Sequence, residues 1–473
     1  MSILQRSLTT VDTRLRVLVI TLALLGAGLL GWSPSPPVLM LLVGGAGALV
    51  LVNQPDAAFV VLVIAAYSVP LEFGLGNAFT VSAVHLLLPA LALVRLLRQA
   101  LGSGDRLITS RTFIPLVAFL LAASFSWLYG NVTWVLRFPR RPDLLAIQAS
   151  QWAVYALAVL AYLLAAQQSF RAVRWTTFTF LGLGVLALID RYGGSFGFIG
   201  DLLTAGDAQT NGTFFVWMTA LSGAQALYNG ELPRSWRVAL FLLALSVPLL
   251  GFWQNTGWVT SWLPPLIVLC VLGVLRAPGL GLAFVVLAFM GVLLSLDAKP
   301  LQSIWESEQG SVAGRIVLWR SVIQLGLRKP LFGLGLTTYH QYHMYIPLLT
   351  EGGRWYQPNI NSHNLYIDLF AQLGLVGLVV FFWAVAEIGL FAWRLRRTIR
   401  NGFNRAYVTS ALAGLVGMLV ASAIVEWLLP FVYNAGLKGQ RFGVFSWVFL
   451  GGLVALQGSM RGGDETCESD YRQ

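Results

Sequence analysis

The sequence predicts an all-α membrane protein that crosses the bilayer many times. Hydrophobic residues make up 57% of the 473 residues and charged residues only 11%, which leaves too few polar side chains to cover a soluble protein. The apolar residues also gather in runs of about 20, the length that a helix needs to cross the hydrocarbon core. We therefore expect about 12–14 transmembrane helices, together with one large external loop that contains surface helices.

Hydropathy places the predicted spans along nearly the whole chain, with short connections that often contain Pro or Gly. The spans are residues 15–31, 37–53, 57–72, 79–96, 112–130, 149–168, 174–190, 211–228, 237–253, 258–275, 278–296, 364–393, 406–428 and 441–458. No cleavage site with small residues follows the first run, so we interpret it as a retained helix. Four parts result: N-terminal membrane helices (1–296), a large loop (297–363), C-terminal membrane helices (364–460) and a polar tail (461–473).

The positions of Lys and Arg predict which side each connection faces. The densest group of arginines lies in residues 394–405, and Lys and Arg concentrate in the cytoplasmic connections of membrane proteins. Placing this group in the cytoplasm also puts both termini and most other basic residues there. The net charge of +11 then sets the orientation in the membrane, and no nucleic-acid partner is expected. The lipid bilayer is the predicted surrounding, and residues 297–363 face outward.

A smaller set of basic residues falls on the external side, against this bias. Contact with lipid phosphates in the outer headgroup layer is one explanation. Binding of an anionic substrate is the other, because a guanidinium group matches two phosphate oxygens at once. The convergence of several such residues on one loop favours the substrate. The set is Arg137, Arg140, Arg141, Arg191, Arg315, Arg320, Arg328, Lys329 and Arg354.

The external loop is predicted to contain a helix that lies along the membrane surface. Ser311 can cap its first turn, and Pro330 ends it. Apolar residues recur between them at helical spacing, as expected for an amphipathic surface helix. Arg315 is the stronger candidate for a phosphate contact. Arg320 lies about 140° further round the helix, so it is expected to make a second contact or to extend towards the headgroups.

The rest of the loop carries aromatic and polar residues that suit a sugar. Aromatic rings mixed with carboxylates and amides can hold sugar rings, although such residues also form the interface belts of membrane proteins. The histidine pair at 340 and 343 could share a metal, but no spacing fixes a third ligand, so neither a metal nor a cofactor is expected. The substrate-binding candidates are Arg320, Tyr339, His340, Glu351, Arg354, Asn364 and Arg191.

His363 is the candidate catalytic base. It lies at the external end of a long apolar helix, with Asp368 about one turn further on. A histidine can take a proton from a hydroxyl near neutral pH, and a nearby carboxylate can orient the ring. The alternative is that His363 only caps the helix.

Three motifs lie in and after the external loop. They are Gly314-Arg315 followed by Trp319, Arg328-Lys329-Pro330-Leu331-Phe332-Gly333-Leu334-Gly335, and Ser362-His363-Asn364-Leu365-Tyr366 leading into Gly374-Leu375-Val376-Gly377-Leu378. Together they resemble the family of O-antigen ligases and polysaccharide polymerases. The resemblance implies a metal-independent glycosyltransferase of the GT-C type in the bacterial inner membrane. Its donor would be a glycan linked to undecaprenyl diphosphate, and its acceptor a hydroxyl of a lipid or glycan on the periplasmic face. By motif, Arg315 would bind the diphosphate and His363 would activate or orient the acceptor.

One motif of the family's ligases is missing. These ligases usually have a Ser-Arg pair at the start of a span upstream of the large loop, whereas residues 255–262 contain no arginine. Either Arg191 or the group Arg137, Arg140 and Arg141 supplies that charge, or the donor is held differently. The missing pair weighs against a ligase that acts on lipid A–core.

Other functions stay open at this point. A polymerase of repeat units would share the same motifs. A transporter of small anions such as bicarbonate would instead need ionisable residues in the middle of the membrane, often in an internal repeat. Few residues fit that description, and they form no relay, so the sequence favours the enzyme. A structural partner in envelope assembly would not depend on Arg315 or His363. The mid-membrane candidates are Glu72, His85, Glu387 and Glu426.

Overall fold

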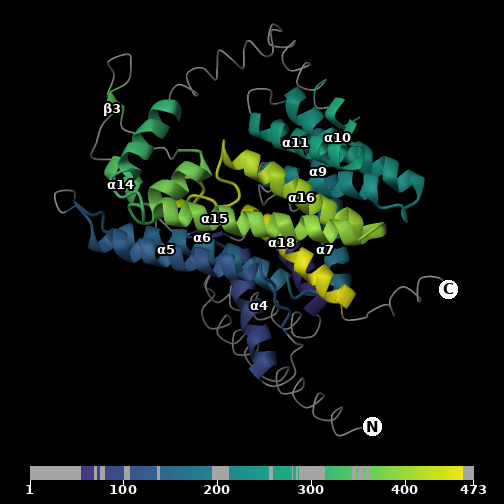
Figure 1. The fold of residues 1–473 in the computed structure, drawn as a ribbon, viewed down its shortest axis with the longest axis horizontal. Coiled ribbons are helices and arrows are strands. Elements are labelled where there is room, and N and C mark those ends of the chain that lie inside the picture. Colours follow the sequence, from purple (N-terminus) through teal and green to yellow (C-terminus); the bar gives the residue numbers. More distant parts are fainter. Residues whose placement is uncertain are drawn as a thin grey trace, which may run out of the picture.

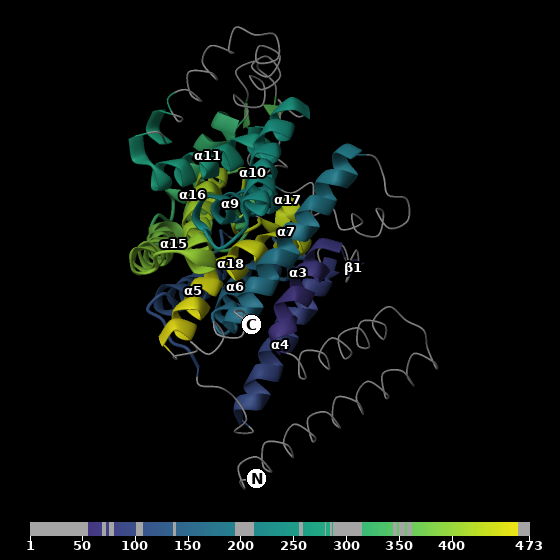
Figure 2. The ribbon, with the colours of Figure 1, turned by 90° about the vertical axis from the view of Figure 1, so that its right-hand side faces the viewer.

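The protein folds as one bundle of long helices lying side by side (Figures 1 and 2). The structure is a computed structural model, and it describes residues 55–68, 72–74, 80–100, 107–135, 139–193, 212–254, 259–279, 281–283, 286, 315–343, 348–349, 355–356 and 362–461. Within these ranges, nine helices are long and apolar enough to cross a membrane. The all-α, multi-pass prediction is therefore confirmed.

The nine long helices correspond to nine of the predicted spans. Predicted spans 15–31 and 37–53, and most of 278–296, lie outside the described residues. The helices are α4 (Ala83–Ala100), α5 (Phe113–Val132), α6 (Leu144–Ala165), α7 (Phe170–Gly193), α10 (Arg234–Gln254), α11 (Val259–Arg276), α15 (Leu365–Thr398), α16 (Gly402–Ser422) and α18 (Gln440–Arg461).

Shorter elements complete the described fold. Among them, β2 pairs with β1 at residues where the sequence predicted the start of a helix, and β3 pairs with β4 inside the large loop. Residues 315–326 are also helical, as predicted for the loop, and Ser311 lies outside the described residues. The elements are η1 (Pro55–Ala57), α3 (Ala58–Ser68), β1 (Glu72–Gly74), β2 (Thr80–Ser82), α9 (Gly212–Tyr228), α14 (Thr338–His343), β3 (Leu348–Leu349), β4 (Trp355–Tyr356), α17 (Val432–Ala435) and η3 (Leu437–Gly439).

Helix α9 forms the centre of the bundle. It is apolar on nearly every side and almost wholly buried, and it packs against α10, α11 and α16. A helix that is hydrophobic all round is stable only when it is covered on all sides. The one strongly polar group of its large Trp217 side chain, the indole N–H, donates to the Ser446 hydroxyl at 2.8 Å.

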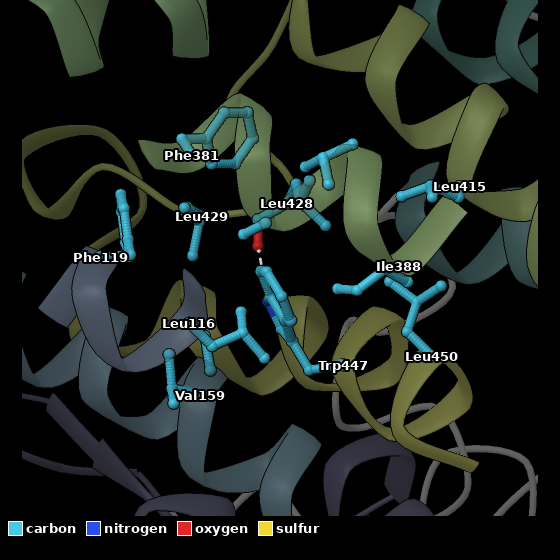
Figure 3. A pocket seen from close by; sticks show the side chains of 13 residues that line it. Leu116, Phe119, Val159, Phe381, Ile388, Leu415, Leu428, Leu429, Trp447 and Leu450 are labelled. Atoms are coloured by element: carbon cyan, nitrogen blue, oxygen red, sulfur yellow. Dashed lines mark hydrogen bonds between the residues drawn. The ribbon is translucent and has the colours of Figure 1, made fainter. Parts of the chain in front are cut away.

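A small void lies in the core between α5, α6, α15, α16 and α18 (Figure 3). Its volume is about 10 Å³ and its lining is apolar, with the indole N–H of Trp447 bound to the Leu428 carbonyl at 3.0 Å. An apolar space of this size stays dry, because a water molecule there would lack polar partners. The void reflects packing, and the polar chemistry lies elsewhere.

One end of the bundle gathers the termini of helices that carry arginines. Arg396, near the end of α15, donates to the Leu275 carbonyl near the end of α11. Arg276 lies over the ring of Tyr228, the last residue of α9. We call this the basic end. It brings together the arginines that the sequence assigned to the cytoplasm, and that orientation stays a prediction.

Helix α15 is broken at Gly374, near the opposite end of the bundle. Gly374 has φ +68° and ψ −167°, which is not a helical conformation. The residues that follow the 315–326 helix run alongside this break and bind its backbone. Leu334 and Gly335 donate N–H groups to the carbonyls of Ala371 and Gln372, at 2.9 and 3.1 Å. The carbonyls of Pro330 and Leu331 accept the N–H groups of residues 375 and 376.

Replacing Gly374 tests how strongly this junction stabilises the fold. A Cβ at Gly374 would overlap the Leu331 carbonyl, and its positive φ is unfavourable for any other residue. We expect Gly374→Ala to lower the free energy of unfolding by about 2 kcal/mol or more. Thermal unfolding in detergent measures it, with Gly389→Ala as the control, because a Cβ there meets only ordinary contacts. Equal melting temperatures for the two variants would contradict the assignment.

Candidate functional site

The candidate site lies at the end of the bundle opposite the basic end, where α15 begins (left side of Figure 1). Four segments meet there: the 315–326 helix, α14, residues 362–364 and the connection that follows α16. Residues 330–335, which are hydrogen-bonded to the break in α15, fix the positions of the 315–326 helix and α14. The site is therefore assembled from parts of the chain that are far apart in sequence.

Asn364 caps the start of α15. Its side-chain oxygen accepts the N–H groups of Tyr366 and Ile367, and its amide group donates to the Ala423 carbonyl at 2.9 Å. The capping role that the sequence left open for His363 thus belongs to its neighbour. Asn364, predicted as a substrate contact, uses its side chain to fix the helix start against the end of α16.

His363 lies just before this cap in an unusual backbone conformation. Its φ is +50°, in the left-handed region that residues other than glycine seldom adopt. Such conformations occur where the surrounding structure holds them, and they gather at functional sites. Ser362 is fixed on the other side, because its carbonyl accepts the indole N–H of Trp319 at 2.6 Å. The backbone of His363 is thus held by the contacts of its two neighbours, Ser362 and Asn364.

The charge of Arg315 acts on His363 at this site. The imidazole is half-buried, and burial lowers its pKa from the ordinary value. The nearby guanidinium of Arg315 lowers that pKa further, whereas the carboxylate of Glu426 raises it. Two residues that the sequence proposed on separate grounds therefore act on each other electrostatically.

Glu426 is the carboxylate beside His363. It is almost fully buried, and its Oε2 lies 3.8 Å from Nδ1 of the imidazole. Its Oε1 accepts an N–H of Asn434 at 2.5 Å. The sequence offered Glu426 only as a mid-membrane group for a transporter. The structure places it after the end of α16, at the site. The signal in the sequence is a lone acid in the apolar connection of residues 423–432.

Asp368 serves a different purpose from the one that the sequence predicted. It was expected to orient His363, but its Oδ1 accepts the hydroxyls of Tyr339 and Ser362, at 2.5 and 2.6 Å. Its Oδ2 has no hydrogen-bond partner among the described residues. The expectation was wrong because Asp368 is buried in the bundle, where the hydroxyls of α14 and of Ser362 meet it, whereas His363 lies before the start of the helix.

Helix α14 is packed into the bundle by its aromatic residues. Tyr339 is fully buried and stacks on Phe431, with ring centroids 5.5 Å apart. His340 is also buried and stacks on Tyr433 at 3.7 Å. Both were predicted as substrate contacts, and in this structure both lie beneath the surface. They hold α14 against the connection that carries Glu426.

His343 is a buried neutral group. Its Nε2 is 3.0 Å from the hydroxyl of Ser321, on the 315–326 helix. Burial and the neighbouring His340 lower its pKa to about 4, so the ring is uncharged at neutral pH. Within the described part of the chain, no three His, Cys, Asp or Glu side chains gather as metal ligands would.

The other arginine candidates differ in their exposure and in their partners. Arg320 is exposed on the 315–326 helix. Arg141 forms a two-pronged ion pair with Asp143, at 2.9 and 2.7 Å. Burial raises the pKa of Tyr433 to about 12, and Arg141 opposes that rise, so its charge lies near the ring that covers His340.

The remaining candidates are only partly visible. The backbone of Arg191 belongs to the last turn of α7, and nothing is described of its side chain. Glu351, Arg354 and Arg137 lie outside the described residues. The sequence offered Arg191 or the group of Arg137, Arg140 and Arg141 in place of the missing Ser-Arg pair. Of these, Arg141 is the one whose charge acts on Tyr433 of α17.

Comparison with known proteins adds one match. The family model described as O-antigen ligase matches residues 234–382, from the start of α10 into α15. No curated protein is similar enough to the chain to be matched. The matched region contains Arg315 and His363 and ends before Glu426. Residues 234–382, which hold Arg315 and His363, are thus similar to the O-antigen ligase family, within a multi-pass membrane protein.

Proposed function

We propose that this protein transfers a glycan from an undecaprenyl-diphosphate donor to an acceptor hydroxyl at the periplasmic face. The single observation that supports it best is that the imidazole of His363 lies 3.8 Å from the carboxylate of Glu426 and is also subject to the charge of Arg315. A lipid-linked donor presents its diphosphate at the membrane surface, within reach of residues at a bundle end. The match of residues 234–382 to the O-antigen ligases supports the same reaction class.

The proposed step replaces one bond at the anomeric carbon of the donor sugar. The acceptor oxygen forms a new bond to that carbon, while the bond from the carbon to the diphosphate oxygen breaks and its electron pair leaves with undecaprenyl diphosphate. His363 takes the proton of the acceptor hydroxyl as a general base. Arg315 stabilises the negative charge that grows on the leaving diphosphate. No metal ion or cofactor enters this scheme.

Glu426 is proposed to position the catalytic imidazole. Nδ1 of His363 faces its carboxylate, so Nε2 is the nitrogen that would take the proton. A carboxylate on the far side of the ring also stabilises the imidazolium that forms after proton transfer. This role was expected of Asp368 from the sequence and falls to Glu426 because of its place in the fold.

A reconstituted system distinguishes ligase from polymerase. The protein is placed in vesicles with an undecaprenyl-diphosphate glycan, with and without a lipid acceptor, and the products are separated on a gel. One added block on the acceptor indicates a ligase, and a ladder made from donor alone indicates a polymerase. Anion uptake into the vesicles without any glycan transfer would reject both and favour a transporter.

Removing either central residue should abolish most of the transfer. We expect His363→Ala to lower the rate about 10²–10⁴-fold, the range for loss of a general base. Arg315→Ala should lower it about 10²–10³-fold, as for loss of a group that stabilises developing charge. Arg400→Ala serves as the control, because it removes an exposed arginine at the basic end. Wild-type rates in both site variants would remove the assignment.

The pH dependence of transfer gives a signature of the three residues acting together. A general base works in its neutral form, so the rate should rise with pH through the pKa of His363, which burial places below the ordinary value. Arg315 lowers this pKa, so the residual activity of Arg315→Ala should need a higher pH. Glu426 raises it, so Glu426→Gln should shift the rise to lower pH. The pH–rate profiles of the two variants should therefore shift in opposite directions from that of the wild-type protein. Identical profiles for all three proteins would contradict the scheme.

A further inference from the structure

An apolar groove runs between α7 and α10, away from the candidate site. Both helices are labelled in Figure 2, and residues of both line the groove. The groove has a volume of about 500 Å³ and is lined by apolar residues and one glycine, among them Phe178, Gly182, Val185, Trp236 and Leu240. This volume falls within the range of about 300–1,000 Å³ that is typical of ligand sites. It lies along the first half of α10, towards the basic end.

Gly182 opens the floor of this groove. A Cβ added there would meet no atom within 4 Å, so the glycine makes no close helix contact that would explain it. Glycine is unfavourable inside a helix relative to alanine. The groove is therefore a real space beside the α7 backbone, and it can be filled by substitution without displacing a neighbour.

Two arginines on α7 stand at the polar end of the groove. Arg174 and Arg171 precede Phe178 by four and seven residues, so they lie on the face of α7 that lines the groove. Both are exposed, and neither forms an ion pair with a described residue. Their guanidinium groups lie over aromatic rings, Arg171 over Trp175 at 4.7 Å and Arg174 over Phe403 at 5.6 Å.

Two carboxylates, Asp56 and Glu231, lie in this region. Asp56 accepts the hydroxyl of Ser169 at 2.6 Å. Glu231 packs against Gly402. These contacts leave both carboxylates charged, but the four arginines at 171, 174, 234 and 237 outnumber them, so this end keeps an excess of positive charge. Trp236 is 63% exposed at the same level, as is usual for a tryptophan at the boundary between lipid tails and headgroups.

We propose that the groove binds an anionic phospholipid, with an acyl chain along Gly182 and the phosphate at Arg171 and Arg174. Charge complementarity selects this occupant, because the arginines suit a phosphate and the lining suits only an alkyl chain. The undecaprenyl donor does not fit as well, since its diphosphate is proposed to lie at the opposite end of the bundle. The inference stands apart from the transfer reaction.

Lipid retention tests the proposal directly. The protein is reconstituted in vesicles of phosphatidylglycerol and phosphatidylcholine in equal amounts, extracted in mild detergent, and its bound lipid is measured by mass spectrometry. We expect retained phosphatidylglycerol to exceed phosphatidylcholine. Gly182→Phe, which fills the groove, should remove this excess. Arg171→Gln with Arg174→Gln should lower it about fivefold for each arginine.

Matched variants serve as controls. Gly279→Phe adds the same side chain at another glycine that has nothing within 4 Å, outside the groove. Arg397→Gln removes another exposed arginine that lies over a tryptophan, Trp393, at the basic end. Both should retain the excess, and the melting temperatures of all variants report folding.

Three results would overturn the proposal. One is equal retention of the two phospholipids by the wild-type protein. Another is that Gly182→Phe loses an added undecaprenyl phosphate but keeps its bound phosphatidylglycerol. That result would make the groove an isoprenoid site. The third is a change of oligomeric state in Gly182→Phe, which would make the groove an interface between two copies of the chain.

Discussion

The break in α15 at Gly374 is the constraint on which the site depends. Inside a membrane, backbone groups released by a broken helix must find partners within the protein, because no water is present to bind them. Residues 330–335 supply these partners for the carbonyls of Ala371 and Gln372. In doing so they anchor the 315–326 helix on one side and α14 on the other. Arg315, Tyr339 and the start of α15 are thereby brought to the same end of the bundle.

The two buried carboxylates at this end, Asp368 and Glu426, make different contacts. Asp368 accepts two hydroxyl groups and ties α14 and Ser362 to α15. Glu426 faces His363, whose half-buried imidazole is also subject to the charge of Arg315. A buried carboxylate is unfavourable without partners, so each position has to be supported by its surroundings. The proposed reaction uses this arrangement, because the opposed charges of Arg315 and Glu426 set the proton affinity of the base.

The two ends of the bundle carry different kinds of positive charge. At the site, the charge of Arg315 acts on an imidazole that faces a carboxylate, which suits the proposed binding of a diphosphate. At the basic end, Arg171 and Arg174 lie over aromatic rings beside an apolar groove, which suits a lipid headgroup. Binding of a phospholipid there would cover the gap between α7 and α10, and so would stabilise the helices around α9.

The sequence alone determined the fold class and the positions of nine described helices, and it singled out Arg315 and His363 as candidate site residues. These follow from hydropathy and from motifs, which are local properties of the chain. Only the tertiary structure decided that Glu426 rather than Asp368 faces His363, that Asn364 rather than His363 caps α15, and that Tyr339 and His340 are buried. The neighbours that a side chain meets come from distant segments, whose positions are fixed by packing and by the backbone hydrogen bonds at Gly374.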